Sequence, residues 1–262
     1  MSRVAPCLPC LAVLVALGGC GDDAPAEPAP TPATEPSPPE PPEIPAPSAT
    51  GAVMHGHYAR ASEARDALIR ADVPAARGHL EWLAAHDEGR ALDGALRPRL
   101  AAMQAAAGAH AEATTLTEAG QALATTLVRC GECHAAVGRR FAMERPPIPE
   151  GEDTPAHMRR HAWAAERMFE GLVIDDVEHF RAGAAALREA PLAPAALGRD
   201  QAPPAQLAAL SAHVHELSAE AEQAADAEAR AAIYGRFLAT CAACHRLLGA
   251  GPGAPVEPTL TP

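Results

Sequence analysis

The pattern Cys-x-x-Cys-His occurs twice in the chain, at Cys130–His134 and again at Cys241–His245. This spacing is the attachment signal of a c-type haem, because two thiols can bond to one porphyrin while the adjacent imidazole ligates its iron. On a helix, positions i, i+3 and i+4 lie on one face, so both sulfurs and the imidazole point toward one flat cofactor. The sequence therefore predicts two covalently bound haem c groups.

The residues expected to hold the two haems follow from the motifs. The thioether bonds are assigned to Cys130, Cys133, Cys241 and Cys244, and the proximal iron bonds to His134 and His245. Two other uses of a Cys-x-x-Cys pair are a redox dithiol and half of a zinc site. A dithiol does not need a histidine at the next position in both copies. Zinc would have to join two pairs that lie more than a hundred positions apart in the sequence.

The amino-terminal segment predicts export from a bacterial cytoplasm. Arg3 gives a positive start, and Leu8–Leu17 is an apolar stretch too short for a stable membrane span. Leu17-Gly18-Gly19-Cys20 resembles a lipobox, which predicts a signal peptide over residues 1–19 and a lipid on Cys20. An ordinary secretory signal is the alternative. Either places the chain in the cell envelope, facing the periplasm; the lipid would anchor it to a membrane, inner or outer.

Residues 20–50 form a lipidated tether in this interpretation, since their Pro, Glu, Ala and Thr content offers almost nothing to bury. Residues 251–262 are a similar Pro-rich segment and are expected to be disordered. The formal net charge is −12, and every basic residue is Arg. A basic patch for nucleic acid is not visible in the sequence, so redox proteins of the cell envelope are the expected partners. The oligomeric state is left open.

The remainder reads as two blocks of similar sequence, 51–143 and 154–250, joined by a Pro-rich connector over residues 144–153. At one constant offset, the first block matches the second: His57 with His161, Leu68 with Leu172, Ile69 with Val173, Asp72 with Asp176. The haem cysteines match at a longer offset, so the second block carries about seven extra residues, placed in the Pro-rich run 191–204. This repeat indicates duplication of one haem-binding unit.

The composition of both blocks predicts helices, because Ala, Leu, Arg and Glu dominate and strand-like alternation is absent. The expected helices are 52–71, 73–86, 95–113, 114–137, 155–172, 176–189, 204–225 and 226–248. Asp72 and Asp176 lie at turns where each can cap the next helix. Short loops join antiparallel neighbours, so the fold expected is all-α, with two tandem four-helix bundles. Aromatic residues are only 3% of the chain, and a buried haem would supply the missing apolar surface.

A haem motif near the end of the fourth helix of a short bundle resembles the class II c-type cytochromes, the cytochrome c′ group. The resemblance covers each block, and implies two such domains in tandem in a dihaem lipoprotein. In low-spin members of that class, a Met of the first helix is the distal iron ligand, whereas cytochrome c′ leaves the position open. This chain offers both residue types there, at Met54 and His57 and at Met158 and His161.

Geometry favours histidine as the distal ligand, because the start of the first helix should lie level with the end of the fourth. We expect His57 and His161 to face His134 and His245, with Met54 and Met158, or an open site, as alternatives. Surface positions are expected for the histidines that have no repeated counterpart, which are His79, His86, His110, His179, His213 and His215.

The expected function is relay of electrons outside the cytoplasm through two bis-His haems, without enzymatic activity. A haem with an open distal position would instead favour binding or sensing of nitric oxide or carbon monoxide, or a small haem reductase.

Overall fold

A computed structural model describes residues 48–86, 92, 94–109, 112–138, 141, 143–188 and 204–249. The predicted signal peptide, Cys20, nearly all of the tether and the carboxyl-terminal tail lie outside these residues. Nearly all of the Pro-rich run assigned the extra residues of the second block also lies outside them. These assignments therefore stay predictions.

The described part of the chain is helical and contains no strand, which confirms the all-α prediction. The elements are α1 (Ala49–Ile69), α2 (Val73–Ala85), the short 3₁₀ helix η1 (Gly94–Leu96), α3 (Arg97–Gly108), α4 (Leu116–Ala136), α5 (Thr154–Val173), α6 (Val177–Ala186), α7 (Pro204–Gln223) and α8 (Ala227–Leu248). Each expected helix is present, with its ends within a few residues of the predicted ones. No described helix is both long enough and apolar enough to cross a membrane.

Side-chain caps fix where several helices begin. Asp72 accepts a hydrogen bond from the Ala75 amide at the start of α2, and Asp176 does the same for His179 at the start of α6. Both caps were predicted from the sequence and are confirmed. Helix α4 begins with a capping box, in which Thr115 and Glu118 satisfy each other's free amides. The Asp72 and Asp176 caps occupy matching positions of the repeat, so the capped turn before α2 recurs before α6.

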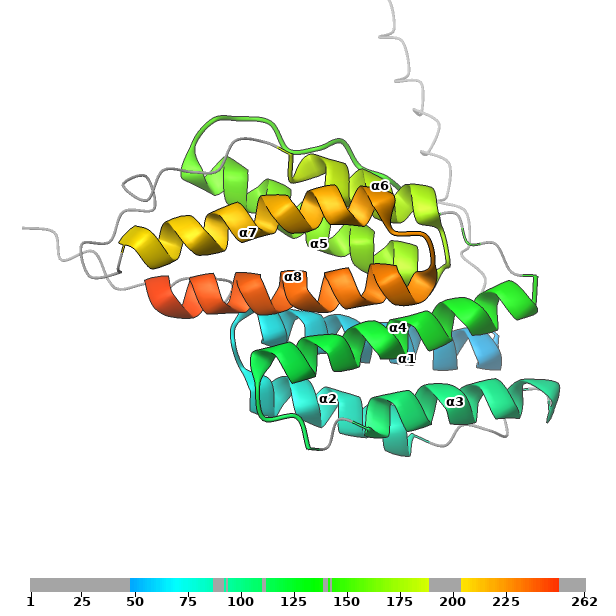
Figure 1. Cartoon of the computed structure of the whole chain (residues 1–262). Helices are drawn as coiled ribbons and strands as arrows, with labels where there is room; N and C mark the ends of the chain where they lie inside the picture. The colour runs from blue at the N-terminus through cyan, green and yellow to red at the C-terminus, as the bar shows by residue number, and fades with distance from the viewer. Residues whose placement is uncertain are drawn as a thin grey trace, which may run out of the picture. The chain divides into compact units, whose positions relative to one another are not determined.

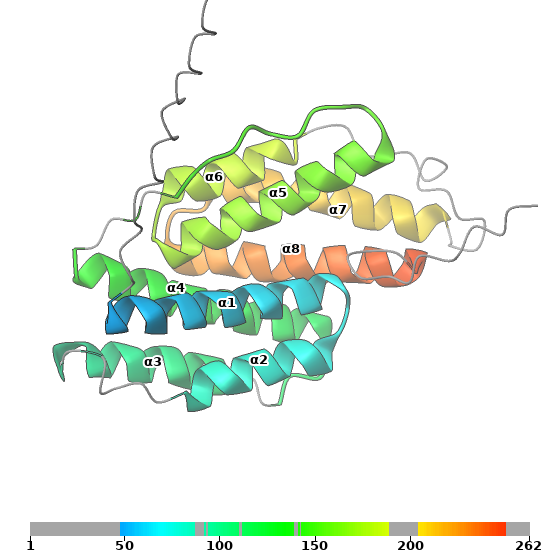
Figure 2. The ribbon, with the colours of Figure 1, turned by 180° about the vertical axis from the view of Figure 1, so that it is seen from behind.

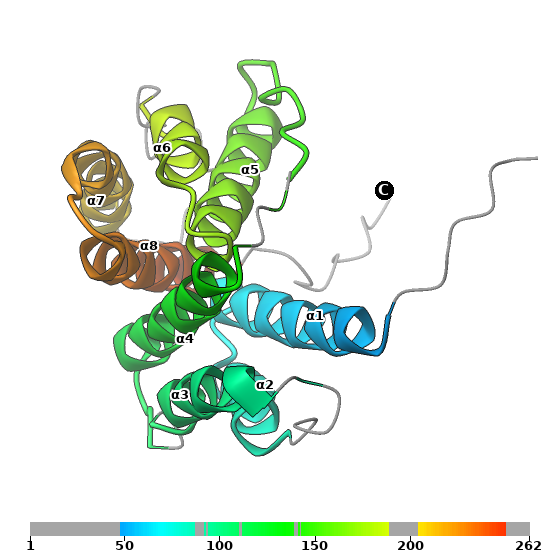
Figure 3. The same ribbon diagram turned by 90° about the vertical axis from the view of Figure 1, so that its right-hand side faces the viewer.

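The eight α-helices of the described residues form a stack of four pairs, seen end-on in Figure 3. The successive pairs are α2 with α3, α1 with α4, α8 with α5, and α7 with α6, and the members of each pair contact each other. The most extensive contact between two helices is that of α4 with α8, which joins the first block to the second. All described helices belong to one compact unit, Ala46–Pro262.

Helices α4 and α8 run in opposite directions through the middle of this stack (Figure 1). They cross at Gly120 and Gly235, where a Cβ on Gly120 would lie 2.6 Å from the Gly235 carbonyl oxygen. A Cβ on Gly235 would lie 2.9 Å from the Gln121 Cα. Any side chain here would force the helices apart, so the two glycines set the closeness of the crossing.

The connector between the blocks is bound to α5 through side chains that donate to its carbonyl oxygens. Arg167 donates to the Glu144 carbonyl, Trp163 to that of Pro146, and Arg160 to that of Gly151. Arg167 is buried and also pairs with Glu170, which accepts from His179 as well. These bonds to main-chain carbonyls hold the Pro-rich connector along α5.

Candidate functional site

Both Cys-x-x-Cys-His motifs lie in the last two turns of a helix, the first in α4 and the second in α8. All four cysteines are free. Burial raises the pKa of Cys130 and of Cys241 to about 12. These two side chains are therefore neutral thiols near pH 7 in the folded chain, and neutral thiols are poor nucleophiles.

The motif histidines share one hydrogen-bond arrangement. In the first motif, Nδ1 of His134 lies 2.8 Å from the carbonyl oxygen of Val173, and in the second, Nδ1 of His245 lies 3.0 Å from that of Ile69. A carbonyl can only accept, so each Nδ1 carries the proton and each Nε2 keeps its lone pair. Iron-ligating histidines characteristically hold the second ring nitrogen in this way. The residues present therefore fit a haem at each motif.

Each of these bonds crosses from one block to the other. His134 belongs to the first block and its acceptor Val173 ends α5, whereas His245 belongs to the second block and its acceptor Ile69 ends α1. In Figure 2 the ends of α4 and α5 lie together on one side and those of α8 and α1 on the other. The two histidines could be predicted from the motifs, but their acceptors could not, since a main-chain oxygen leaves no signal in the sequence.

The second motif has the predicted histidine near it. His161 lies in the third turn of α5, and its pKa is lowered to about 3 by burial and by the charges of His157, His215 and His245. The His157 and His161 rings lie 4.4 Å apart, between centroids. Burial thus holds His161 in the neutral form, which is the form that binds iron. This position stays a prediction for the distal ligand.

The first motif has a different histidine environment. His57 is buried on α1, whose start lies beside the end of α4 (Figure 2). Its ring packs edge-on against the rings of Trp82 and His86 at the end of α2, with centroid distances of 5.9 Å and 6.0 Å. Trp82 and His86 stack on each other at 3.8 Å. The two blocks therefore surround their candidate distal histidines with different side chains.

The candidate methionines are less buried than His57. Met54 and Met158 are both partly exposed, and Met54 packs at the edge of the core. Each lies three residues before the candidate histidine, on the same side of its helix.

The surface prediction is wrong for His179. This residue is 3% exposed and its Nε2 lies 2.7 Å from Glu170 in a buried group with Arg167. The start of α6, capped by Asp176, turns the His179 side chain inward. The sequence did not show this, because His179 has no counterpart in the first block. His215 is also half-buried and bonds the Leu187 carbonyl through Nδ1. His110 lies outside the described residues. His157 was overlooked, although it lies four residues before His161 and so shares its helix face.

The structure separates the two motifs. The start of α4, at Thr114–Thr117, lies beside Ala239, Ala243 and Arg246 near the end of α8, so the two helices are antiparallel and their motif ends point apart. One zinc ion cannot join cysteine pairs that are held in this way. Within the described ranges, no three His, Cys, Asp or Glu side chains form a group that could hold a bare metal ion.

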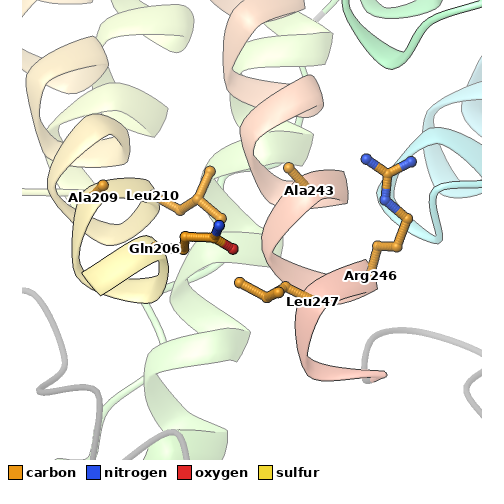
Figure 4. A pocket seen from close by; sticks show the side chains of 6 residues that line it. All are labelled: Gln206, Ala209, Leu210, Ala243, Arg246 and Leu247. Atoms are coloured by element: carbon orange, nitrogen blue, oxygen red, sulfur yellow. The ribbon is translucent and has the colours of Figure 1, made fainter. Parts of the chain in front are cut away.

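Two pockets flank the end of α8. The larger, of about 560 Å³, is lined by Gln206, Ala209 and Leu210 of α7 and by Ala243, Arg246 and Leu247 of α8 (Figure 4). The smaller, of about 370 Å³, lies between the start of α4 and α8. The α8 residues of both pockets lie on the opposite side of the helix from Cys241, Cys244 and His245. Neither pocket is therefore the space into which the motif residues point.

Comparisons with protein-family models, with curated proteins and with solved structures found no match to this chain. The resemblance to class II cytochromes thus depends on the two motifs, their place in the helices and the repeat.

Proposed function

We propose that this chain is a dihaem c-type cytochrome that carries electrons outside the cytoplasm. In this proposal each block is a four-helix haem bundle, with the haem held by Cys130, Cys133 and His134 in the first and by Cys241, Cys244 and His245 in the second. A haem c supplies an iron that alternates between the ferric and ferrous states and so stores one electron.

One observation carries the proposal. Both motif histidines donate Nδ1–H to a main-chain carbonyl, at 2.8 Å and 3.0 Å, beside two free cysteines on the same helix face. A redox dithiol gains nothing from such a bond, whereas an iron ligand gains a fixed tautomer, a fixed ring plane and a more basic Nε2. The recurrence of the bond at both motifs makes a common role the simplest explanation.

Intact mass of the full chain, produced together with a c-haem attachment system, tests this function. The mass should exceed that of the unmodified polypeptide by two haems, which acidified organic solvent should not extract. A double change of Cys130→Ser and Cys133→Ser should remove one covalent haem and spare the other. A chain that carries no covalent haem under these conditions would contradict the proposal.

Electron relay, as opposed to gas binding, depends on the distal side. We propose His57 and His161 as the distal ligands, which would give two six-coordinate low-spin haems. If the unchanged protein bound carbon monoxide readily at both irons, the gas-binding alternative would replace relay.

Attachment to the cell envelope is part of the same proposal and depends on the lipobox at Cys20. Cys20→Ala should move the protein from the membrane fraction to the soluble periplasmic fraction. A variant that stays membrane-bound would show that the tether is not anchored by a lipid on this residue.

A further inference from the structure

We infer that each block supplies the positioning element for the proximal histidine of the other block: the last turn of α5 orients His134, and the last turn of α1 orients His245. The inference depends on the proposed haem attachment and adds to it residues that are not in either motif. It makes the proximal histidine of each haem site depend on a helix end of the other block.

Helices α1 and α5 end in the same kind of turn. In α1 the Asp72 amide bonds the Ala67 carbonyl at 2.9 Å and the Ala71 amide bonds that of Leu68 at 2.8 Å. Helix α5 ends with the same pair of bonds, from Asp176 to Gly171 at 2.9 Å and from Asp175 to Leu172 at 3.4 Å. This is the Schellman arrangement, completed by a residue of positive φ, 62° at Ala71 and 50° at Asp175.

A Schellman turn satisfies only part of the helix end. It pairs the third- and second-last helical carbonyls and leaves the last helical one pointing outward. That last carbonyl belongs to Ile69 in α1 and to Val173 in α5, and these are the two oxygens that accept from the motif histidines. The same turn in both blocks thus presents the same acceptor, and a histidine from the other block takes it in each case.

The contacts between the blocks are symmetric. Ile69 and Val173 occupy matching positions of the sequence repeat, as do His134 and His245. Exchanging the blocks therefore converts one crossed bond into the other. The guanidinium of Arg65 lies 5.2 Å from the centre of the Phe169 ring, and these residues also occupy matching positions of the two blocks. A contact between matching positions is what an approximate twofold axis requires.

The first motif packs closely against the end of α5. Gly131, the second residue of that motif, is buried, and a Cβ there would lie 2.5 Å from the Leu172 carbonyl oxygen and 3.3 Å from Asp175. The helix end can approach only because this residue has no side chain. Asp175 is further held by Arg230 of α8, at 3.0 Å. The turn that carries the acceptor of His134 is therefore packed tightly between α4 and α8.

Gly131→Ala tests the inference in the full haem-loaded chain. The added methyl should push the last turn of α5 away and weaken the bond from His134 to Val173. A proximal imidazole without that acceptor is a weaker donor to iron, so the reduction potential of one haem should rise and the other should stay. The matched control is Gly78→Ala, where a Cβ meets nothing within 4 Å, and it should shift neither potential.

The equivalent substitution in the second motif shows which haem each helix end affects. Ala242 occupies in the second motif the position of Gly131 and is fully buried. Ala242→Val should therefore raise the potential of the other haem. Shifts of the same haem by both variants, of both haems by one variant, or of neither would overturn the inference, while two retained haems would keep the proposed function intact. Loss of all haem from the unchanged chain would instead remove the proposed function.

A measurement on the unchanged protein tests the crossed bonds even if the variants do not fold. In the fully reduced, low-spin state, nuclear magnetic resonance should show two ring Nδ1 protons that exchange slowly with solvent. Exchange at the rate of a solvent-exposed imidazole at both histidines would contradict the crossed bonds.

Discussion

A histidine that binds iron through Nε2 must hold its other ring proton somewhere, and the choice of acceptor sets both the ring plane and the donor strength. In this chain the acceptors are Ile69 and Val173, which are apolar residues that act through their main-chain oxygens. Substitution of their side chains would leave the bonds in place. The orientation of His134 and His245 therefore depends on backbone geometry as well as on the side chains of the two motifs.

Replacement of His161 by Ala should open the second haem to carbon monoxide. The reason is that His161, which burial keeps neutral, is the distal ligand that we propose for this haem. Met158→Ala is the matched control one turn away and should leave the second haem low-spin. Carbon monoxide difference spectra and electron paramagnetic resonance of the two variants provide the measurement. Opening by the Met change alone would reverse the assignment to His/Met ligation.

Ala71→Gly should stabilise the fold by about 0.5–1 kcal/mol, because Ala71 has a φ of 62° in a conformation that L side chains disfavour. Ala59→Gly is the control in an exposed, ordinary helical position of α1 and should destabilise by about 1 kcal/mol. Denaturant unfolding followed by circular dichroism gives both values. A loss of stability at both positions would show that the turn after α1 is not left-handed in solution.

Some of the residues described above could be predicted from the sequence, and others could not. The motif cysteines and histidines carry their own signal, and the recurrence of His161 with His57 led to its prediction as a distal ligand. The buried group of Glu170, Arg167 and His179 was not found, since nothing in the repeat marks it. The crossed acceptors could not be found either, because they depend on how two distant helix ends meet.

Local chemistry was sufficient to predict where the helices begin and where loops separate them, but not how the helices cross. Asp72 and Asp176 predicted the starts of α2 and α6, and clusters of Pro and Gly predicted the boundaries between the longer helices. The crossing of α4 with α8 was not predicted. A glycine in a helix commonly has no packing role, and only the close approach of Gly120 to Gly235 shows that these two have one.

Gly235→Ala should destabilise the fold by about 1–3 kcal/mol, because the new methyl would overlap the backbone of α4 at Gln121. Gly78→Ala, on an exposed position of α2, should stabilise by up to about 1 kcal/mol, as the same substitution does in an ordinary helix. The free energies of unfolding of the two variants, measured against the unchanged protein, test whether α4 and α8 cross closely at this point. Equal effects of the two substitutions would mean that α4 and α8 do not cross at this point.

At the scale of the whole described unit, antiparallel α4 and α8 carry the two motifs apart. His134 follows Gly120 by 14 positions and His245 follows Gly235 by 10, in opposite directions. At about 1.5 Å per residue this separates the histidines by roughly 36 Å along the helices. The division into two blocks was predicted from the sequence, whereas this separation depends on the way in which the blocks are joined.

The two proposed haems, at that separation, should act as independent one-electron sites. Pulsed electron paramagnetic resonance on the fully oxidised protein should place the irons on the order of 35 Å apart. Reduction of one haem should leave the potential of the other almost unchanged, because charges so far apart are screened by salt. A distance of half this value, or strongly coupled potentials, would contradict the antiparallel arrangement.

The crossed bonds also impose an order in time on a chain that emerges with its amino end first. Ile69 precedes His245 by 176 positions, so the acceptor for the second histidine exists long before that histidine does. Val173, in contrast, follows His134 by 39 positions. The first motif therefore emerges while its acceptor is still to come, and its histidine has no partner until the second block begins to fold.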